Sequence, residues 1–335
     1  MNTAPKPRVL VARQVFDEVI EKLAGHFELQ YNQADAVWTQ DELIARLQGM
    51  DGAFVTGTEA IDRRLLDACP QLRAVCTMAV GYNNIDLAAC TERGVLVSNA
   101  PDVLTETTAD FGFALMMATA RRITESEHFL RAGRWTRWGH DMFAGADVHG
   151  ATLGVLGMGR IGQAIARRGA LGFGMSVLYH NRSRLDPAVE AKLGARYVDK
   201  ATLLRESDHL VLVLPYSPAS HHAIGAAELA LMKPTATLTN VARGGIVDDA
   251  ALAEALRERR IAAAGLDVFE GEPAVHPALL QLPNVVLTPH IASASLPTRL
   301  AMAQLAADNL IAALGQGPHA GRPPTALNLQ VLGAR

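Results

Sequence analysis

Three polar residues in the second half of the chain have side chains that together could transfer a proton at a carbonyl group. They are Arg243, Glu272 and His290. A guanidinium can hold a carboxylate by two parallel hydrogen bonds. A carboxylate bonded to one ring nitrogen of a histidine favours the imidazolium form and leaves the other nitrogen facing a substrate. Because a carbonyl reduced by hydride needs such a proton donor, we interpret these three residues as catalytic.

Each of the three also has a purely structural interpretation. Arg243 could be a surface arginine, Glu272 a turn carboxylate and His290 a packed loop histidine. Their positions favour function, because Arg243 follows the expected strand Thr235–Val241 and His290 follows the expected strand Val285–Thr288. Ligands of open α/β sheets bind outside the carboxyl ends of the strands.

A glycine-rich fingerprint near the middle of the chain indicates a dinucleotide. Gly157, Gly159 and Gly162 follow the apolar segment Ala151–Leu156, and a helix-like pattern comes after them. Such glycines permit a tight strand-to-helix turn, in which backbone N–H groups approach a pyrophosphate. The motif alone is weak evidence, but the strand, helix and second strand around it complete the required unit. We expect Gly157, Gly159, Arg160, Ile161 and Gly162 to border the cofactor.

The segment after the next strand indicates which dinucleotide is preferred. An NAD enzyme usually presents an acidic residue here to the ribose hydroxyls, whereas this chain presents Asn181, Arg182 and Ser183. Without a carboxylate there is no repulsion toward a 2′-phosphate, and Arg182 and Ser183 offer it a charge and a hydrogen bond. We predict a preference for NADP(H), with NAD(H) and a solvent-exposed Arg182 as the alternative.

Strand-like and helix-like segments alternate along the chain, which predicts parallel sheets covered by helices. The strands expected in the first region are residues 8–13, 27–31, 53–56, 74–78 and 95–98. The strands expected later are residues 151–156, 175–180, 210–214, 235–241, 262–268 and 285–288. A long helix is expected from Leu104 to about Ile123, and the last helix, Pro297–Leu314, is expected to return to the first region. We therefore predict an α/β protein. A Rossmann-type dinucleotide-binding domain (103–294) is inserted into a smaller, flavodoxin-like, doubly wound substrate domain (1–102 and 295–335), with a cleft between them.

Composition restricts the classes of partner. The 335 residues carry a net charge of −3, which argues against a nucleic acid. The apolar stretch Phe111–Ala120 is too short to span a bilayer, and Met1–Pro7 has no apolar signal region. The three cysteines lack C-x-x-C spacing, so neither a disulfide framework nor a metal site is expected. We interpret the chain as a soluble, cytoplasmic protein with no membrane partner.

Together these motifs resemble those of the D-isomer-specific 2-hydroxyacid dehydrogenase family over nearly the whole chain. The segments that carry the resemblance are Val80–Asp86, Val148–Gly154, Ala242–Gly245, Gly265–Pro273 and Pro289–Ser293. The resemblance implies that Arg243 binds and polarises a 2-oxoacid, that His290 is the acid/base, and that Glu272 sets the proton affinity of His290.

The resemblance also implies roles for residues that the chemistry alone does not select. The backbone amides of Val80 and Gly81 would hold the substrate carboxylate. Asp267 would lie near the nicotinamide, and Pro215 and Val241 along the nucleotide. One departure is Ala292, where the family commonly has glycine; the added methyl group is expected near the substrate pocket.

Within the family, His180–Ser183 and His290–Ser293 look most like the glyoxylate/hydroxypyruvate reductases, including the 2-ketogluconate reductases. The expected substrate is therefore a small or hydroxylated 2-oxoacid: glyoxylate, hydroxypyruvate or 2-ketogluconate. A 3-phosphoglycerate dehydrogenase is the enzymatic alternative, although the chain ends without room for the regulatory domain that many of these carry. Formate or phosphite oxidation fits Glu272 with His290 less well. A dinucleotide-sensing corepressor is the non-enzymatic alternative.

The resemblance finally implies a homodimer. Residues 121–150 correspond to an arm between subunits, and Trp138 lies within it. We expect Trp138 to approach the partner subunit's pocket; the alternative is a core tryptophan at the base of the arm.

Overall fold

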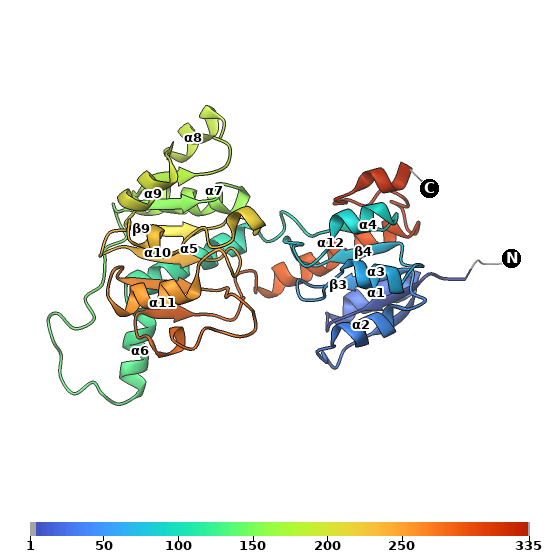
Figure 1. The fold of residues 1–335 in the computed structure, drawn as a ribbon, viewed down its shortest axis with the longest axis horizontal. Coiled ribbons are helices and arrows are strands. Elements are labelled where there is room, and N and C mark those ends of the chain that lie inside the picture. The colour runs from blue at the N-terminus through green and yellow to red at the C-terminus, as the bar shows by residue number, and fades with distance from the viewer. Residues whose placement is uncertain (1–4, 334–335) are drawn as a thin grey trace. The chain divides into compact units, whose positions relative to one another are not determined.

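The chain divides into two compact units in the computed structural model, which describes residues 5–333 (Figure 1). Unit 1 comprises Met1–Leu104 and Ser295–Arg335, and unit 2 comprises Thr105–Ala294. Residues 1–4 and 334–335, at the two ends of the expected substrate domain, lie outside the described part. Residues 1–4 also belong to Met1–Pro7, the segment without an apolar signal region. No described helix is long and apolar enough to cross a membrane.

Unit 1 is built on a five-stranded parallel sheet with the order β2-β1-β3-β4-β5. This is the flavodoxin-like order. The strands are β1 (Arg8–Val11), β2 (Glu28–Tyr31), β3 (Gly52–Val55), β4 (Ala74–Thr77) and β5 (Leu96–Ser98).

Helices cover both faces of this sheet because alternate strand residues point to opposite sides. In β1, Val9 and Val11 pack with α1 (Asp17–His26) and α12 (Leu296–Ala313). Leu10 packs on the other face with α2, α3 and α4. Those helices span Gln40–Leu47, Arg63–Ala68 and Leu87–Glu92. Thr39 and Glu42 form a capping box that fixes the start of α2.

Unit 2 contains a seven-stranded parallel sheet with the order β12-β11-β10-β9-β6-β7-β8. Counted from β6, this is the doubly wound order of dinucleotide-binding folds with a seventh strand added. The strands are β6 (Thr152–Leu156), β7 (Ser176–His180), β8 (Ala195–Tyr197), β9 (His209–Leu212), β10 (Thr237–Asn240), β11 (Ala263–Leu266) and β12 (Val285–Leu287).

Two apolar clusters hold helices against this sheet. One cluster joins Val155 and Tyr179 to α5, α7 and α8, and the other joins Leu156 and Leu212 to α9, α10 and α11. The helices of unit 2 are α5 (Thr105–Ala120), α6 (Ile123–Arg131), α7 (Arg160–Arg167), α8 (Pro187–Leu193), α9 (Lys200–Glu206), α10 (Ala226–Leu229) and α11 (Asp249–Arg257). The short helical turns η1 (Arg168–Gly172), η2 (Pro218–Ser220) and η3 (Leu279–Gln281) lie in unit 2, and η4 (Leu329–Gly333) lies in unit 1.

The α/β fold class predicted from the sequence is confirmed, with two local differences. The strand β8 was not expected. The helix expected to reach about Ile123 ends at Ala120, because Arg122 adopts a left-handed conformation (φ 53°) from which α6 starts in a new direction. Figure 1 shows α6 and the loop after it projecting from unit 2.

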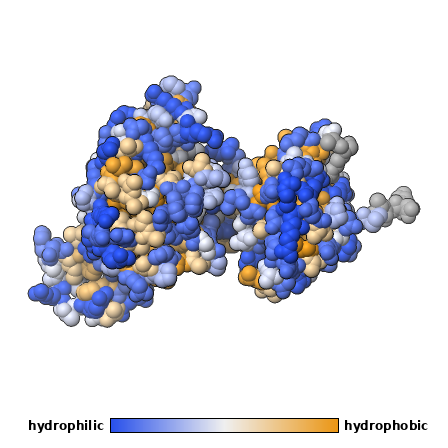
Figure 2. Space-filling model, viewed as in Figure 1, coloured by the Kyte–Doolittle hydropathy of each residue, from blue (hydrophilic) through white to orange (hydrophobic). Residues whose placement is uncertain are grey.

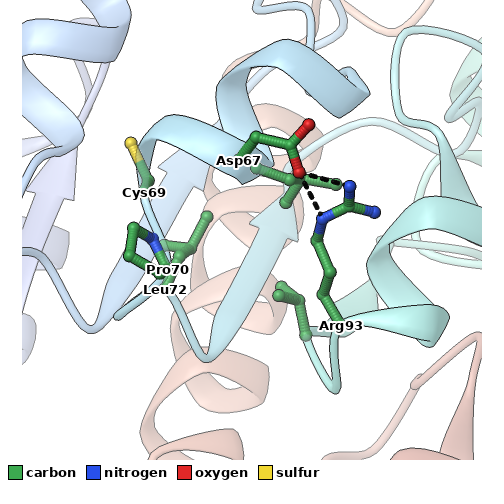
Figure 3. A pocket seen from close by; sticks show the side chains of 7 residues that line it. Asp67, Cys69, Pro70, Leu72 and Arg93 are labelled. Atoms are coloured by element: carbon green, nitrogen blue, oxygen red, sulfur yellow. Dashed lines mark hydrogen bonds and ion pairs between the residues drawn. The ribbon is translucent and has the colours of Figure 1, made fainter.

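Two pockets lie at the amino ends of strands. In unit 1, a pocket of about 260 Å³ is lined by residues that precede β4 and β5. Figure 3 shows Arg93 paired with Asp67 in this pocket, with Cys69 nearby. In unit 2, a pocket of about 540 Å³ is lined partly by residues that precede β10, β11 and β12. Because ligands of parallel sheets bind at the carboxyl ends, neither pocket is where the candidate catalytic residues are expected.

Candidate active site

The three candidate catalytic residues of unit 2 follow neighbouring strands. Arg243 comes three residues after β10, Glu272 lies in the loop after β11, and His290 comes three residues after β12. These strands are adjacent and parallel, so their carboxyl ends meet at one edge of the sheet.

Glu272 and His290 form a direct pair. The Nδ1 atom of His290 lies 2.7 Å from Oε2 of Glu272, and the Phe269 N–H donates to Oε1 at 2.8 Å. The carboxylate is thus fixed from both sides. The His290 side chain is 46% exposed, and no hydrogen bond in the described part of the chain engages its Nε2. One ring nitrogen is therefore oriented by the protein, while the other is open to a ligand.

Glu272 is held in its charged form. Burial alone would raise the pKa of Glu272, but the hydrogen bonds from His290 and the Phe269 N–H, with the charge of Arg243, outweigh burial. The pKa therefore lies below its ordinary value. An anionic Glu272 stabilises a protonated imidazole at His290, as a proton donor requires.

The loop that carries His290 is fixed by Asp267, whose side chain is fully buried. Its carboxylate accepts hydrogen bonds from Thr288 Oγ1 at 2.7 Å and from the N–H groups of Ile291 and Ala292, both at 2.8 Å. Burial raises the pKa of Asp267, although these hydrogen bonds oppose the shift. His290 itself has φ 54°, and its N–H donates to the Asp267 carbonyl at 2.9 Å.

Asp267, expected near the nicotinamide, thus also determines the backbone that presents His290. Ala292 is 7% exposed and belongs to the apolar cluster of α5 and α7. It packs within unit 2, and the expectation that its methyl group lies near the substrate pocket stays a prediction.

Arg243 has no ion pair among the described residues. Its Nη1 donates to the carbonyl of Ala242 at 2.6 Å. Burial lowers the pKa of the Arg243 guanidinium, opposed by the charge of Glu272. Since an arginine remains charged in spite of such a shift, this group lacks a bonded counter-ion and is suited to bind an anionic ligand.

A close backbone contact joins the Arg243 loop to the Glu272 loop. A Cβ atom at Gly244 would lie 1.7 Å from the carbonyl oxygen of Phe269. Only glycine fits this position. The contact places Gly244 against Phe269, and the N–H of Phe269 donates to Glu272.

The glycine fingerprint forms a turn with an open surface. Gly157 has φ 101°, and a Cβ there would lie 2.7 Å from the Leu214 nitrogen. A Cβ at Gly162 would lie 2.2 Å from the Gly157 carbonyl, so α7 packs directly on the turn. A Cβ at Gly159 would meet nothing within 4 Å, and the first N–H groups of α7 have no partner within the helix. The turn therefore fits a pyrophosphate.

The remaining candidate cofactor residues follow the carboxyl ends of strands or begin α7. Val241 is buried beyond β10, Pro215 is exposed beyond β9, Arg160 is exposed, and Ile161 is half-buried.

Two adjacent residues after β7 are available for a ligand. Arg184 is paired with Glu190 at 2.7 Å. In contrast, Arg182 and Ser183 are exposed, and neither side chain has a hydrogen bond or ion pair with another described residue. The neighbouring Asn181 is half-buried, and its carbonyl accepts from Tyr197 Oη at 3.3 Å. The loop is thus anchored by its other residues while Arg182 and Ser183 face solvent.

In unit 1, Val80 and Gly81 follow β4. Within the described residues, neither backbone N–H has a hydrogen-bond partner. Asn99 fixes the segment by donating from Nδ2 to the Val80 carbonyl at 2.7 Å. Two successive N–H groups without a partner are available as donors to an anion. Asn99 was not selected from the sequence, because an asparagine after a strand has no signal that distinguishes it from an ordinary turn residue.

The parallel sheet of unit 2, its open glycine turn and its oriented histidine define the class of protein: an oxidoreductase that uses a nicotinamide dinucleotide. A family model described as "D-isomer specific 2-hydroxyacid dehydrogenase, NAD binding domain" matches residues 113–292. The chain belongs to this family and is an NAD(P)-dependent 2-hydroxyacid dehydrogenase.

Relatives of full length agree with this assignment. The chain is 46% identical to a glyoxylate reductase of Thermococcus onnurineus, and the match covers 98% of both chains. A solved NADPH-dependent glyoxylate/hydroxypyruvate reductase of Sinorhizobium meliloti, in complex with NADP and malonate, is 39% identical with a TM-score of 0.84. That match covers 96% of this chain and 97% of the other. A solved glyoxylate reductase of Paecilomyes thermophila is 32% identical with a TM-score of 0.86. That match covers 98% of this chain and 100% of the other.

Proposed function

We propose that the protein reduces a small 2-oxoacid to the D-2-hydroxyacid. Glyoxylate and hydroxypyruvate are the preferred substrates, and 2-ketogluconate is a third candidate. NADPH is the preferred reductant. The observation that carries the proposal is the Glu272–His290 pair, with the second ring nitrogen of His290 open. The names of the full-length relatives support the substrate class.

Each residue then has a defined task. When bound, the reduced nicotinamide supplies a hydride to the carbonyl carbon. His290 donates the proton on Nε2 to the carbonyl oxygen, which completes the alcohol, and Glu272 stabilises the imidazolium before the transfer. Arg243 binds the oxoacid and polarises its carbonyl through the guanidinium fork.

Residues of each unit would bind a different part of the ligands. In unit 1, the N–H groups of Val80 and Gly81 bind the substrate carboxylate. In unit 2, the turn at Gly157, Gly159 and Gly162 binds the dinucleotide. Asp267, Pro215 and Val241 border the nucleotide.

The NADP preference is proposed from Arg182 and Ser183, which are exposed after β7. A charge-assisted hydrogen bond to a phosphate is worth about 1.5–3 kcal/mol. We expect Arg182→Ala to lower kcat/KM for NADPH by roughly tenfold or more and to leave kcat/KM for NADH nearly unchanged. Arg196→Ala is the matched control, because Arg196 is another exposed arginine of the same sheet edge, paired with Glu206 at 2.9 Å.

The deciding experiment is a panel of 2-oxoacids assayed with NADPH and with NADH. The panel contains glyoxylate, hydroxypyruvate, 2-ketogluconate and phosphorylated hydroxypyruvate. The proposal predicts the highest kcat/KM with NADPH and one of the first three. A clear preference for NADH would overturn the cofactor assignment, and turnover of the phosphorylated acid alone would overturn the substrate assignment.

A further inference from the structure

Two histidines and a glutamate gather near the Glu272 loop without taking part in the reaction described above. One ring nitrogen each from His221 and His222 and one carboxylate oxygen of Glu270 lie within 4.8 Å of one another. This is the one such group of three or more histidine, cysteine or acidic side chains found within the described residues. No local sequence pattern predicts this group, because the histidines and the glutamate are almost fifty residues apart.

The backbone holds the two loops that supply these side chains. His221 and His222 lie after β9 and η2, and the N–H of His222 donates to the Gly245 carbonyl at 2.7 Å. Glu270 follows β11, and its N–H donates to the Asp249 carboxylate at 3.1 Å. The backbone N–H groups of His222 and Glu270 are therefore held by hydrogen bonds that do not depend on the three clustered side chains themselves.

The outer nitrogen of each ring faces a second polar group. His222 Nδ1 lies 3.8 Å from the Asp248 carboxylate, whereas its Nε2 lies 3.0 Å from Glu270 Oε2. His221 Nδ1 lies 3.3 Å from the Tyr216 hydroxyl, which leaves Nε2 unengaged. The two rings are stacked, with centroids 3.9 Å apart. One ring must therefore rotate before both rings can direct an in-plane nitrogen at the same ion. A polar group behind the second nitrogen of a ring is what orients metal-binding histidines.

The types of donor select the ion. Two imidazole nitrogens and one carboxylate oxygen are the protein ligands of many zinc sites, whereas Mg²⁺ and Ca²⁺ prefer oxygen alone. Donors about 2.0–2.2 Å from a tetrahedral ion lie roughly 3.3 Å apart. His222 Nε2 and Glu270 Oε2 are 3.0 Å apart and share a hydrogen bond, so an ion that replaces the shared proton needs them to separate by only a few tenths of an ångström. The His222 and Glu270 side chains are 36% and 43% exposed, so they can rotate and leave further positions for water.

We propose that His221, His222 and Glu270 bind a divalent transition-metal ion of the zinc class. A bound ion would link the loop after β9 to the loop that carries Glu272. It would also stabilise unit 2 against thermal unfolding, because the unfolded chain does not bring these residues together.

The test is metal binding by the full chain without a histidine tag. Titration calorimetry with Zn²⁺ should give one ion per chain, and Co²⁺ should give visible absorption bands. His222→Ala and Glu270→Gln should each weaken binding by at least about tenfold, with His221→Ala as a third variant. His128→Ala is the matched control, because His128 is exposed and 3.9 Å from Glu127 but belongs to no group of three metal-ligand side chains within the described residues.

Circular dichroism and dinucleotide binding establish that each variant is folded. Wild-type affinity in folded His222→Ala and Glu270→Gln proteins would overturn the proposal. So would the absence of a one-to-one complex with Zn²⁺, or an equal loss of affinity in His128→Ala. The readouts are binding and spectra, so they do not depend on the proposed substrate or on any dehydrogenase activity.

Discussion

At the scale of single residues, the two ring nitrogens of His290 have different environments. Nδ1 lies against an anionic carboxylate that is itself held by the Phe269 N–H, and Nε2 has no partner in the described part of the chain. The tautomer and the orientation of the ring are thus set by Glu272, while the protonatable nitrogen remains accessible. This asymmetry is the reason for assigning proton transfer to His290 and only a positioning role to Glu272.

Replacing Glu272 by glutamine tests this division of roles. The amide keeps a hydrogen-bonding oxygen but carries no charge, so it cannot stabilise an imidazolium electrostatically. We expect kcat/KM for reduction at neutral pH to fall by roughly tenfold or more, measured by the loss of NADPH absorbance.

Glu254→Gln is the control for that experiment, because Glu254 is an exposed carboxylate on α11. Its kcat/KM should match the wild type. A wild-type kcat/KM in Glu272→Gln would remove the electrostatic role assigned to Glu272.

Residue types predicted the candidate catalytic side chains better than they predicted the backbone donors and hydrogen bonds that accompany them. Arg243, Glu272 and His290 could be selected because their chemistry is complementary and two of them directly follow expected strands. The unpaired N–H groups of Val80 and Gly81 depend on backbone geometry, and the Asn99 and Asp267 contacts depend on distant segments. No local pattern in the sequence encodes such contacts.

At the scale of elements, most strands could be located within one or two residues because buried parallel strands are continuous apolar runs. The strand β8 escaped detection because it has three residues, with the exposed Arg196 at its centre. The end of α5 was misplaced because a left-handed arginine at position 122 has no sequence signature. Elements whose residues are buried could be predicted from the sequence. The end of a helix that depends on one backbone angle could not.

The amino ends of the central strands of unit 2 are joined by Asp208. Its carboxylate accepts from the Thr152 N–H at 2.9 Å and from Lys233 Nζ at 2.7 Å. Burial alone would raise the pKa of Asp208, but these two hydrogen bonds outweigh it and the pKa lies below its ordinary value. The ionised form therefore stabilises the fold above the unfolded-state pKa, and this stabilisation disappears as the pH falls through the lower folded-state pKa.

Asp208→Asn should consequently lower the free energy of unfolding at pH 7 by about 1 kcal/mol, a value reduced by the partial exposure of the pair. The difference from the wild type should shrink below about pH 4. Urea denaturation at several pH values measures both effects. Glu21→Gln, an exposed position on α1, serves as the control. A difference that stays constant with pH would contradict the account of Asp208.

At the scale of the whole molecule, the chain carries an apolar surface that a single copy does not cover. None of the residues of α6 is buried. The exposed apolar side chains of this arm include Ile123, Leu130, Trp135 and Trp138. In Figure 2 the projecting region that corresponds to α6 carries both hydrophobic and hydrophilic residues. The alternative that Trp138 is a core residue is wrong, since its side chain is 71% exposed.

We therefore propose a homodimer in which this arm contacts the partner subunit. Trp138→Ala should weaken the dimer, because a buried tryptophan at an interface contributes about 2 kcal/mol or more. Light scattering across a dilution series measures the dissociation, and the KM for the oxoacid shows whether the partner's site is affected. Leu280→Ala, which alters an exposed apolar residue outside the arm, is the control. An unchanged dimer and an unchanged KM would exclude this role for Trp138.

The most direct test of the account is the rate at which NADPH is oxidised with glyoxylate or hydroxypyruvate by the wild type and by His290→Ala. If Nε2 of His290 supplies the proton, kcat should fall by roughly 10²–10⁴-fold, while the affinity for NADPH, measured by fluorescence titration, should be retained. A wild-type kcat in His290→Ala, or a wild-type protein that reduces neither acid, would contradict it.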